Sequence, residues 1–255
     1  TEVLEGFSVV EDSLNRTISG SMKENAALYQ RLGDKLKTNP DKVKAWFDKA
    51  EGVKAASDSL YNLAQRLKEQ IVKEADGQDG DVRNIVNKEN LEAASRVMLA
   101  PVSGQGQRLF KAINTYRDYI LRMVTDPSQR EIIAQNLSTA VPKARQMGKN
   151  WQEYMFESMP VSAAVTLLSK LQSDIRYAEG LHTLVANIDL KDIRVNKLDA
   201  FVIPEKTTLY PGETFSAGIV MAAVDTTQQP DIYINGKRVT LRGGRYAFTA
   251  GGIGE

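Results

Sequence analysis

The side chains that could do acid–base chemistry in this chain are few, and the most suggestive pair is Glu153 with Glu157. These residues lie four apart on one face of a predicted helix over residues 143–158, and two nearby carboxyl groups can share the roles of general acid and general base. No surrounding pattern indicates that either acid is desolvated, and Lys149 is spaced to form an ordinary helix salt bridge with Glu153. The sequence therefore favours a structural role for both acids.

The single histidine and the serines of the following helix offer little more. One histidine, His182, leaves no partner for a two-histidine metal site and little scope for a histidine-dependent triad. A pH-sensing role for His182 is an alternative to a packing role at a helix contact. Ser162, Ser169 and Ser173 have no neighbouring base in the sequence, so nucleophilic catalysis has no support. We expect no catalytic residue and no enzymatic activity.

Composition excludes further classes of site. The chain has no cysteine, which rules out disulfides and thiolate ligands and fits either the cytosol or a Gram-negative periplasm. Lys and Arg number 33 against 32 Asp and Glu, without a basic block, which argues against nucleic acid or a polybasic membrane patch. The tract DGQDGD at 76–81 lacks the alternating acids of a calcium loop, and GQGQ at 104–107 lacks the GK[ST] ending of a phosphate loop. We predict no metal and no cofactor.

The element that positions most of these residues is a helix predicted over 160–188. Pro160 suits its first turn, and at about 1.5 Å per residue it would be a rod of about 40 Å. Apolar residues recur along it three or four apart, and polar residues fill most of the remaining face. The apolar stripe comprises Val161, Val165, Leu168, Leu171, Ile175, Ala178, Leu181 and Val185; the polar residues include Ser169, Lys170, Gln172, Asp174, Arg176 and Glu179. We predict an inter-domain rod with a core of Val165, Leu168, Leu171, Ile175 and Val185.

The residues before this rod predict an elongated all-helical bundle over 1–190. Two helices, from Glu2 for about 35 residues and from Pro40 to about Ala75, form an antiparallel hairpin around Asn39-Pro40. Shorter helices are predicted at 87–100, 107–124, 127–142 and 143–158. The stripe of the first helix begins with Val3, Phe7, Val10, Leu14, Ile18 and Met22.

After residue 190 the pattern is typical of strands. We predict them at 198–203, 213–223, 232–234, 237–241 and 245–249, with Asn235-Gly236 in a hairpin turn. The layout suits an immunoglobulin-like β-sandwich, although residues 191–255 fall short of the ~100 residues of that fold. The predicted fold class is therefore α+β in separate domains, a helical bundle followed by the incomplete start of a sandwich.

Four stretches resemble one known family. They are TEVLEGFSVVEDSLNRT at 1–17, DSLYNL at 58–63, FESMPVSAAVTLLSKLQSDIRYAEG at 156–180 and KLDAFVIPEKTTLYPGETFSAGI at 197–219. In this order they are similar to the GldM/PorM family of gliding and type IX secretion motor proteins, and the resemblance spans the whole chain.

The resemblance implies a dimeric periplasmic protein with an inner-membrane helix ahead of Thr1. In that family the membrane helix sits within the GldL/PorL partner, the distal end contacts the GldK/PorK and GldN/PorN ring, and the protein transmits motion driven by the proton gradient. No catalytic or proton-path residue is carried over to this chain. Because two membrane helices emerge close together, we expect Phe7, Val10 and Leu14 to pack near the dimer axis. The alternative is a soluble periplasmic adaptor that recognises a peptide or protein through its bundle.

Overall fold

The computed structural model describes residues 2–77, 80–183, 197–204, 208, 211–212, 214, 216–224, 232–234 and 236–239. The chain divides into two compact units, Thr1–Ile188 and Asp189–Glu255. The sequence pattern puts the change of character two residues later. Each unit is described by itself.

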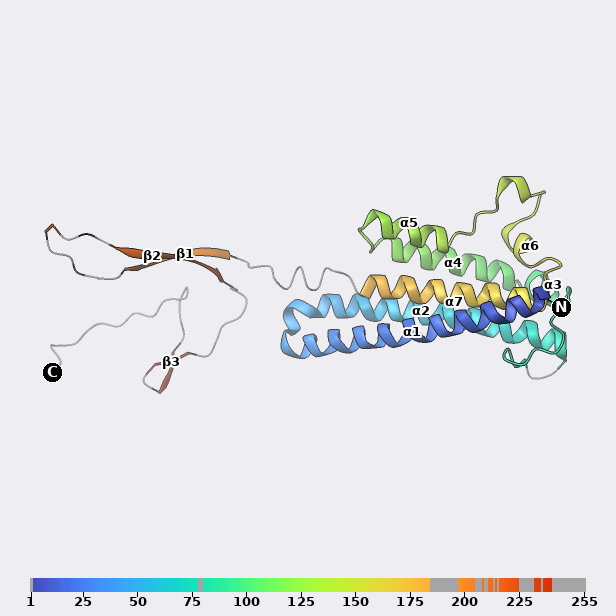
Figure 1. Ribbon diagram of the computed structural model, residues 1–255, viewed down its shortest axis with the longest axis horizontal. Helices are drawn as coiled ribbons and strands as arrows, with labels where there is room; N and C mark the ends of the chain where they lie inside the picture. The colour runs from blue at the N-terminus through green and yellow to red at the C-terminus, as the bar shows by residue number, and fades with distance from the viewer. Residues whose placement is uncertain are drawn as a thin grey trace. The chain divides into compact units, whose positions relative to one another are not determined.

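Two long antiparallel helices form the base of the first unit (Figure 1). Helix α1 spans Glu2–Thr38 and α2 spans Pro40–Asp76, each about 55 Å long at 1.5 Å per residue. The predicted break between the two helices at Asn39-Pro40 is confirmed. Pro40 stands in the first turn of α2, where its missing N–H costs nothing. The Asn39 side chain, however, makes no capping hydrogen bond. At the other end Gly77 adopts the left-handed conformation that ends α2.

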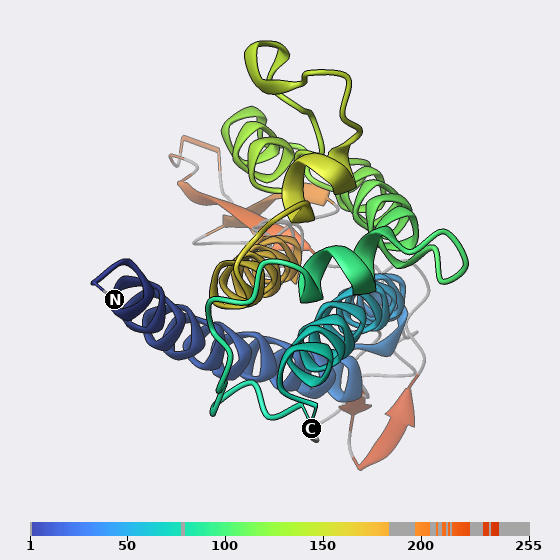
Figure 2. The same ribbon diagram turned by 90° about the vertical axis from the view of Figure 1, so that its right-hand side faces the viewer.

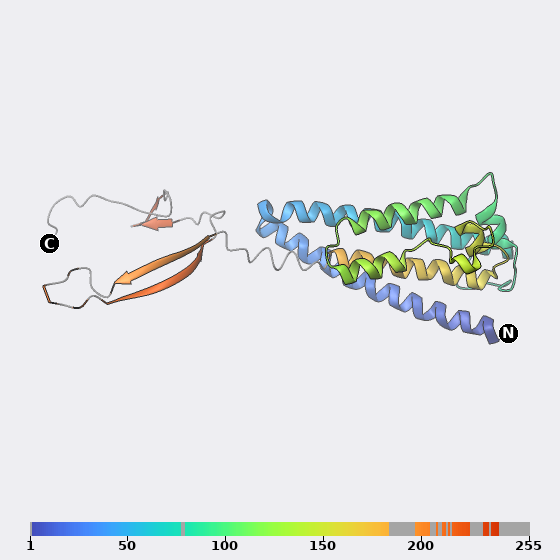
Figure 3. The same cartoon turned by 90° about the horizontal axis from the view of Figure 1, so that it is seen from above.

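Helix α7, Val161–Thr183, lies against both α1 and α2 (Figures 1 and 3). Its first backbone N–H groups are satisfied by the loop before α3, because Val161 N donates to Asn90 O (3.1 Å) and Ser162 N donates to Lys88 O (3.2 Å). The predicted start at Pro160 is thus correct to one residue. The last part of the predicted rod, 184–188, lies outside the described residues, and so does Val185.

The smaller helices cover α7 and α2 on the side away from α1 (Figure 2). Their bounds are Ala93–Leu99 for α3, Gln105–Leu121 for α4, Pro127–Asn136 for α5 and Trp151–Phe156 for α6, with a short 3-10 turn at Lys143–Arg145. Helix α5 is capped by Asp126, whose carboxylate accepts a hydrogen bond from Gln129 N at 2.9 Å. The predicted end at Pro142 is six residues too late.

Two predicted helices were too long. The helix predicted at 143–158 is interrupted because Met147 and Gly148 both have positive φ, 42° and 77°, after which Asn150 begins α6 with a capping box. The helix predicted at 87–100 begins only at Ala93, because the Asn90 side chain accepts the backbone N–H groups of Glu92 and Ala93.

The predicted stripe of α1 was partly wrong. Val3, Val10 and Met22 are exposed, with 72%, 47% and 43% of their surface accessible. The residues of α1 that face the bundle instead follow a 3.5-residue period that includes polar members. They are Leu4, Phe7, Glu11, Leu14, Ile18, Ser21, Asn25, Leu28 and Leu32. Tracing apolar residues alone led the prediction off this face wherever a polar residue occupied it.

The second unit contains two antiparallel strand pairs among its described residues. Strand β1, Lys197–Pro204, pairs with β2, Ala217–Val224, so that Phe201 lies opposite Val220. Strand β3, Ile232–Ile234, pairs with β4, Lys237–Val239, through a turn in which Gly236 has a φ of 74°. Both pairings agree with the predicted strands; the predicted strand at 245–249 lies outside the described residues. The immunoglobulin-like sandwich stays a prediction.

Candidate functional site

Helix α7 is buried on two faces, one apolar and one polar. The apolar face carries Val165, Leu168 and Ile175, all buried in the main core, with Leu171 partly buried beside them. The opposite face is covered by α1 and α2, although its side chains are polar or charged. Its buried members are Ser162, Thr166, Ser169, Gln172, Arg176 and Glu179.

Arg176 is the centre of the first buried network on this face. Its Nη1 donates to Asp58 Oδ1 of α2 at 2.8 Å and to Glu179 Oε2 at 2.7 Å. Its guanidinium carbon lies 4.3 Å from the ring centre of Tyr61, a cation–π distance. From α1, the Tyr29 hydroxyl donates to Glu179 Oε1 at 2.9 Å. One cation therefore holds two carboxylates, and the network joins three helices.

The electrostatics of this network keep its charges in place. Burial alone would raise the pKa of Asp58, but the hydrogen bonds and charges of Arg176 and Lys54 outweigh burial and hold the pKa below its ordinary value. Burial raises the pKa of Tyr29, and the neighbouring Glu179 raises it further, so the hydroxyl stays a neutral donor. At neutral pH the first network is thus a set of charge-assisted hydrogen bonds made through Arg176 Nη1, while Arg176 Nε is buried without a partner among the described residues.

Lys68 is the centre of a second network two turns nearer the start of α7. Only 2% exposed, its ammonium nitrogen lies 2.5 Å from Ser169 Oγ, 3.2 Å from Glu11 Oε1 and 3.3 Å from Gln172 Oε1. The Ser169 hydroxyl also lies 2.5 Å from Glu11 Oε1. These contacts again join α1, α2 and α7.

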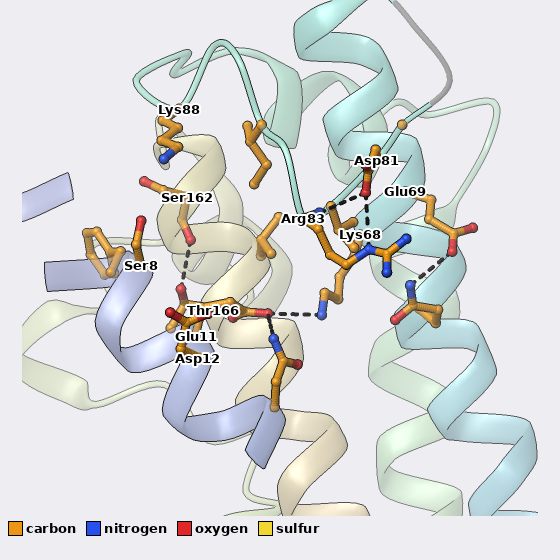
Figure 4. Close-up of a pocket in the computed structure, with 17 residues that line it drawn as sticks. Ser8, Glu11, Asp12, Lys68, Glu69, Asp81, Arg83, Lys88, Ser162 and Thr166 are labelled. Carbon is orange, nitrogen blue, oxygen red and sulfur yellow. Dashed lines mark hydrogen bonds and ion pairs between the residues drawn. The ribbon is translucent and has the colours of Figure 1, made fainter. Parts of the chain in front are cut away.

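A pocket of about 790 Å³ opens next to the second network, where α1 diverges from the other helices toward its N-terminal end (Figures 3 and 4). Glu11, Lys68 and Ser162 line it together with Arg83 and Lys88 of the loop before α3. Glu11 Oε2 and Ser162 Oγ are buried without a hydrogen-bond partner in the part of the chain that the structure describes. The pocket can therefore offer an acceptor and a hydroxyl to a polar group.

The Lys68–Ser169 contact corrects the expectation that no base neighbours Ser169. Lysine can serve as the base for a nucleophilic serine. Here, however, Ser169 is fully buried, and the three donors of the Lys68 ammonium face three oxygens. The arrangement is suited to holding helices together and not to attacking a substrate.

The other candidate residues from the sequence have structural partners or lie outside the description. Glu153 accepts from Asn150 N at 2.9 Å in the capping box of α6. The predicted Lys149–Glu153 salt bridge is wrong, because Lys149 pairs with Glu157 at 2.5 Å instead. The side chain of His182 lies outside the described residues. Among the described residues there is no cluster of three or more potential metal ligands.

Sequence reasoning missed both networks, although one signal was available. On α1, Glu11 and Asn25 occupy positions of the 3.5-residue repeat that would otherwise be apolar, and a polar residue at such a position often fixes the register between helices. Lys68 gave no comparable signal, because a single lysine beside the apolar stripe of α2 looks like a solvent-exposed residue.

These features define a class: an α-helical bundle protein in which buried ion pairs bind three long helices side by side. The chain belongs to the GldM family. The model of the GldM N-terminal domain matches residues 2–187 and the model of the GldM second domain matches residues 189–255. A comparison with curated proteins gives no significant match.

Membership supports a part in the gliding and type IX secretion machinery of the cell envelope, of which this family is a structural component. None of the helices among the described residues is long and apolar enough to cross a membrane.

Proposed function

We propose that this chain is a non-enzymatic mechanical arm of the type IX secretion and gliding machinery. In this proposal the full-length protein is anchored in the inner membrane, works in the periplasm as a homodimer and receives motion from GldL/PorL. It passes that motion to the ring of GldK/PorK and GldN/PorN through the helical bundle and an immunoglobulin-like second domain.

The observation that supports this proposal most is the double burial of α7. An arm that carries force must not let its helices slide past one another, and the two networks tie α7 to α1 and α2 at positions about two turns apart. The chain then passes from α7 into the second unit. The core residues Val165, Leu168, Leu171, Ile175 and Val185 are proposed to make this passage stiff.

A flexible insertion tests the mechanical proposal. We expect that about twelve glycine and serine residues inserted between Ile188 and Asp189 of the full-length protein will abolish gliding and secretion, because such a linker transmits little force or torque. Secreted proteins in the medium, gliding on a surface and the cellular level of the protein would be measured in parallel.

The matched control places the same insertion in the loop after Gly77, which follows the end of α2 and is not between the units. That variant should retain secretion. If the insertion at Ile188 also left secretion intact at normal protein levels, the periplasmic adaptor would be the better account. The pocket beside Glu11, with its unpartnered Glu11 and Ser162 oxygens, is the feature that favours this alternative.

We further propose that α1 contacts its counterpart in the dimer near Phe7, Val10 and Leu14. Val10 and, one heptad earlier, Val3 are exposed on α1, while Phe7 and Leu14 are half-buried on the side toward the bundle. An exposed apolar edge of this kind is suited to a second helix. Val10 would therefore lie nearest the partner, flanked by the other two.

Cysteine cross-linking tests this interface against a background without native cysteine. A Val10→Cys variant of the full-length protein should form a disulfide-linked dimer under mild oxidation in cells, because the two residues would face each other across the axis. An Ile18→Cys variant, on the buried side of α1, is the control and should stay monomeric on a non-reducing gel. A Val10→Cys variant that never cross-links would contradict the proposed axis.

A further inference from the structure

A second surface of the bundle, between α2 and α4, has the composition of a binding groove. It encloses about 530 Å³, and α4 lies on the side of α2 away from α1 (Figures 1 and 2). The two helices run antiparallel (Figure 1). They contact each other where the Ser57 and Tyr116 hydroxyls form a hydrogen bond of 2.8 Å. The apolar floor of the groove is formed by the partly exposed Ala56, Ala112 and Tyr119, which lie over the buried Leu60 and Leu63.

The rim of this groove is basic. It is lined by Arg66 of α2, by Arg108 and Lys111 of α4 and by Arg122, the residue after α4, and by no aspartate or glutamate. All four cations are exposed. In a chain whose net charge is only +1, four cations around one groove are a local concentration of charge.

None of these four side chains has a hydrogen bond or ion pair within the described ranges of the chain. Many other basic residues of the bundle are paired: Arg96, for example, meets Glu74 at 3.3 Å and Glu92 at 2.5 Å. Asp118, four residues before Arg122, is paired with Arg117 at 3.2 Å. The rim cations repel one another in the free protein, so an anionic partner would gain both the attraction and the relief of that repulsion.

The geometry favours an acidic helix as the occupant. A groove between two antiparallel helices with an apolar floor suits the apolar face of a third helix, while acids on the flanks of that helix would meet the rim. From Arg108 to Arg122 the rim extends about 21 Å along α4 at 1.5 Å per residue. A small anion would use the cations but leave Ala56, Ala112 and Tyr119 uncovered, and a basic or neutral helix would leave the cations unpaired.

We propose that the α2–α4 groove binds an acidic amphipathic helix of a partner protein. The inference is independent of the mechanical role proposed above, because that role makes no use of this surface. It would give the bundle a lateral attachment site distinct from the α1 edge proposed for the dimer.

A peptide-binding measurement on the 255-residue chain tests the chemistry. The probe is a fluorescent synthetic helix of about four turns with leucine on one face and glutamate on its flanks. We expect binding that weakens as salt rises and that falls about 2-fold to 25-fold in the Arg108→Glu, Lys111→Glu double variant, since each exposed pair accounts for about 1.4-fold to fivefold. The charge-matched control, Lys143→Glu with Arg145→Glu on the exposed 3-10 turn, should bind as the unaltered chain does. Circular dichroism checks that both variants fold, and Arg66→Glu on α2 supplies an independent rim variant.

Equal binding to the unaltered chain and the rim variants would overturn the proposal. Equal binding of a lysine-flanked peptide would also overturn it, because recognition would then not depend on the basic rim. Equal binding of polyglutamate without leucine would do the same, because recognition would then not depend on the apolar floor. In cells, a photo-reactive residue at Thr115, which lines the groove, should cross-link to an acidic segment of another protein. Cross-linking to a second copy of this chain, to lipid or to nothing would contradict the proposed partner.

Discussion

Replacing Arg176 by methionine should lower the free energy of unfolding of the helical bundle by about 3–5 kcal/mol, the range for breaking a buried ion pair by removing one partner. Methionine keeps much of the length and apolar volume of the arginine stem but removes the Arg176 charge beside Glu179, which is 2% exposed. Asp58 would lose the hydrogen bond and charge of Arg176, which hold its pKa down, but would keep those of Lys54 at 3.3 Å. The cost arises mainly from the buried Glu179 carboxylate, which loses the Arg176 charge, and not from a cavity.

Urea unfolding followed by far-ultraviolet circular dichroism measures this loss, because the helical signal comes from the first unit of the described chain. Lys44→Met is the control: it removes an exposed i,i+4 pair with Asp48 and should cost at most about 0.5 kcal/mol. Adding Glu179→Gln to Arg176→Met should recover part of the loss, because the second change removes one stranded charge. A single variant as stable as Lys44→Met would show that the network is not a structural tie.

The two faces of α7 show which parts of the structure could be predicted from the sequence and which could not. The 3–4 spacing of Val165, Leu168 and Ile175 identified the apolar face, since burial of a stripe is a local property of a helix. The polar face gave no such signal, because whether Arg176 or Lys68 is solvated depends on what other helices place opposite. Apart from Glu179, which is three residues from Arg176, the side chains that bind the two centres lie at least 57 positions away in sequence.

Helix boundaries, too, were predictable where a local feature of the sequence sets them. Those set by proline were predicted to within a residue, as at Pro40 and Pro127, because proline acts through its own ring. The interruption of the helix predicted at 143–158 depends on Met147 in a conformation that non-glycine residues seldom adopt. Helix propensity alone does not reveal that choice, and α6 starts only after it, at the capping box of Asn150 and Glu153.

On the apolar face of α7, the same leucine-to-alanine substitution should have very different effects on stability at two positions. Leu168→Ala should cost about 2–5 kcal/mol, since the side chain is 1% exposed in the main core and its removal leaves a cavity. A pocket of about 270 Å³ already lies beside both Leu168 and Leu171, so either truncation would enlarge it, and the larger loss at Leu168 reflects the fuller burial of that side chain. We expect the upper half of that range.

Leu171→Ala is the matched control, because it removes the same atoms one turn later, where the leucine is only partly buried. It should cost about 1 kcal/mol, the typical value for a substitution that empties no closed core. The same urea unfolding measurement gives both values, and the difference between them cancels the intrinsic preference of leucine and alanine for a helix. Equal losses for the two variants would mean that α7 does not have the sided burial described here. A loss at Leu168 alone, accompanied in cells by loss of gliding at normal protein levels, would tie the stiffness of this face to the proposed arm.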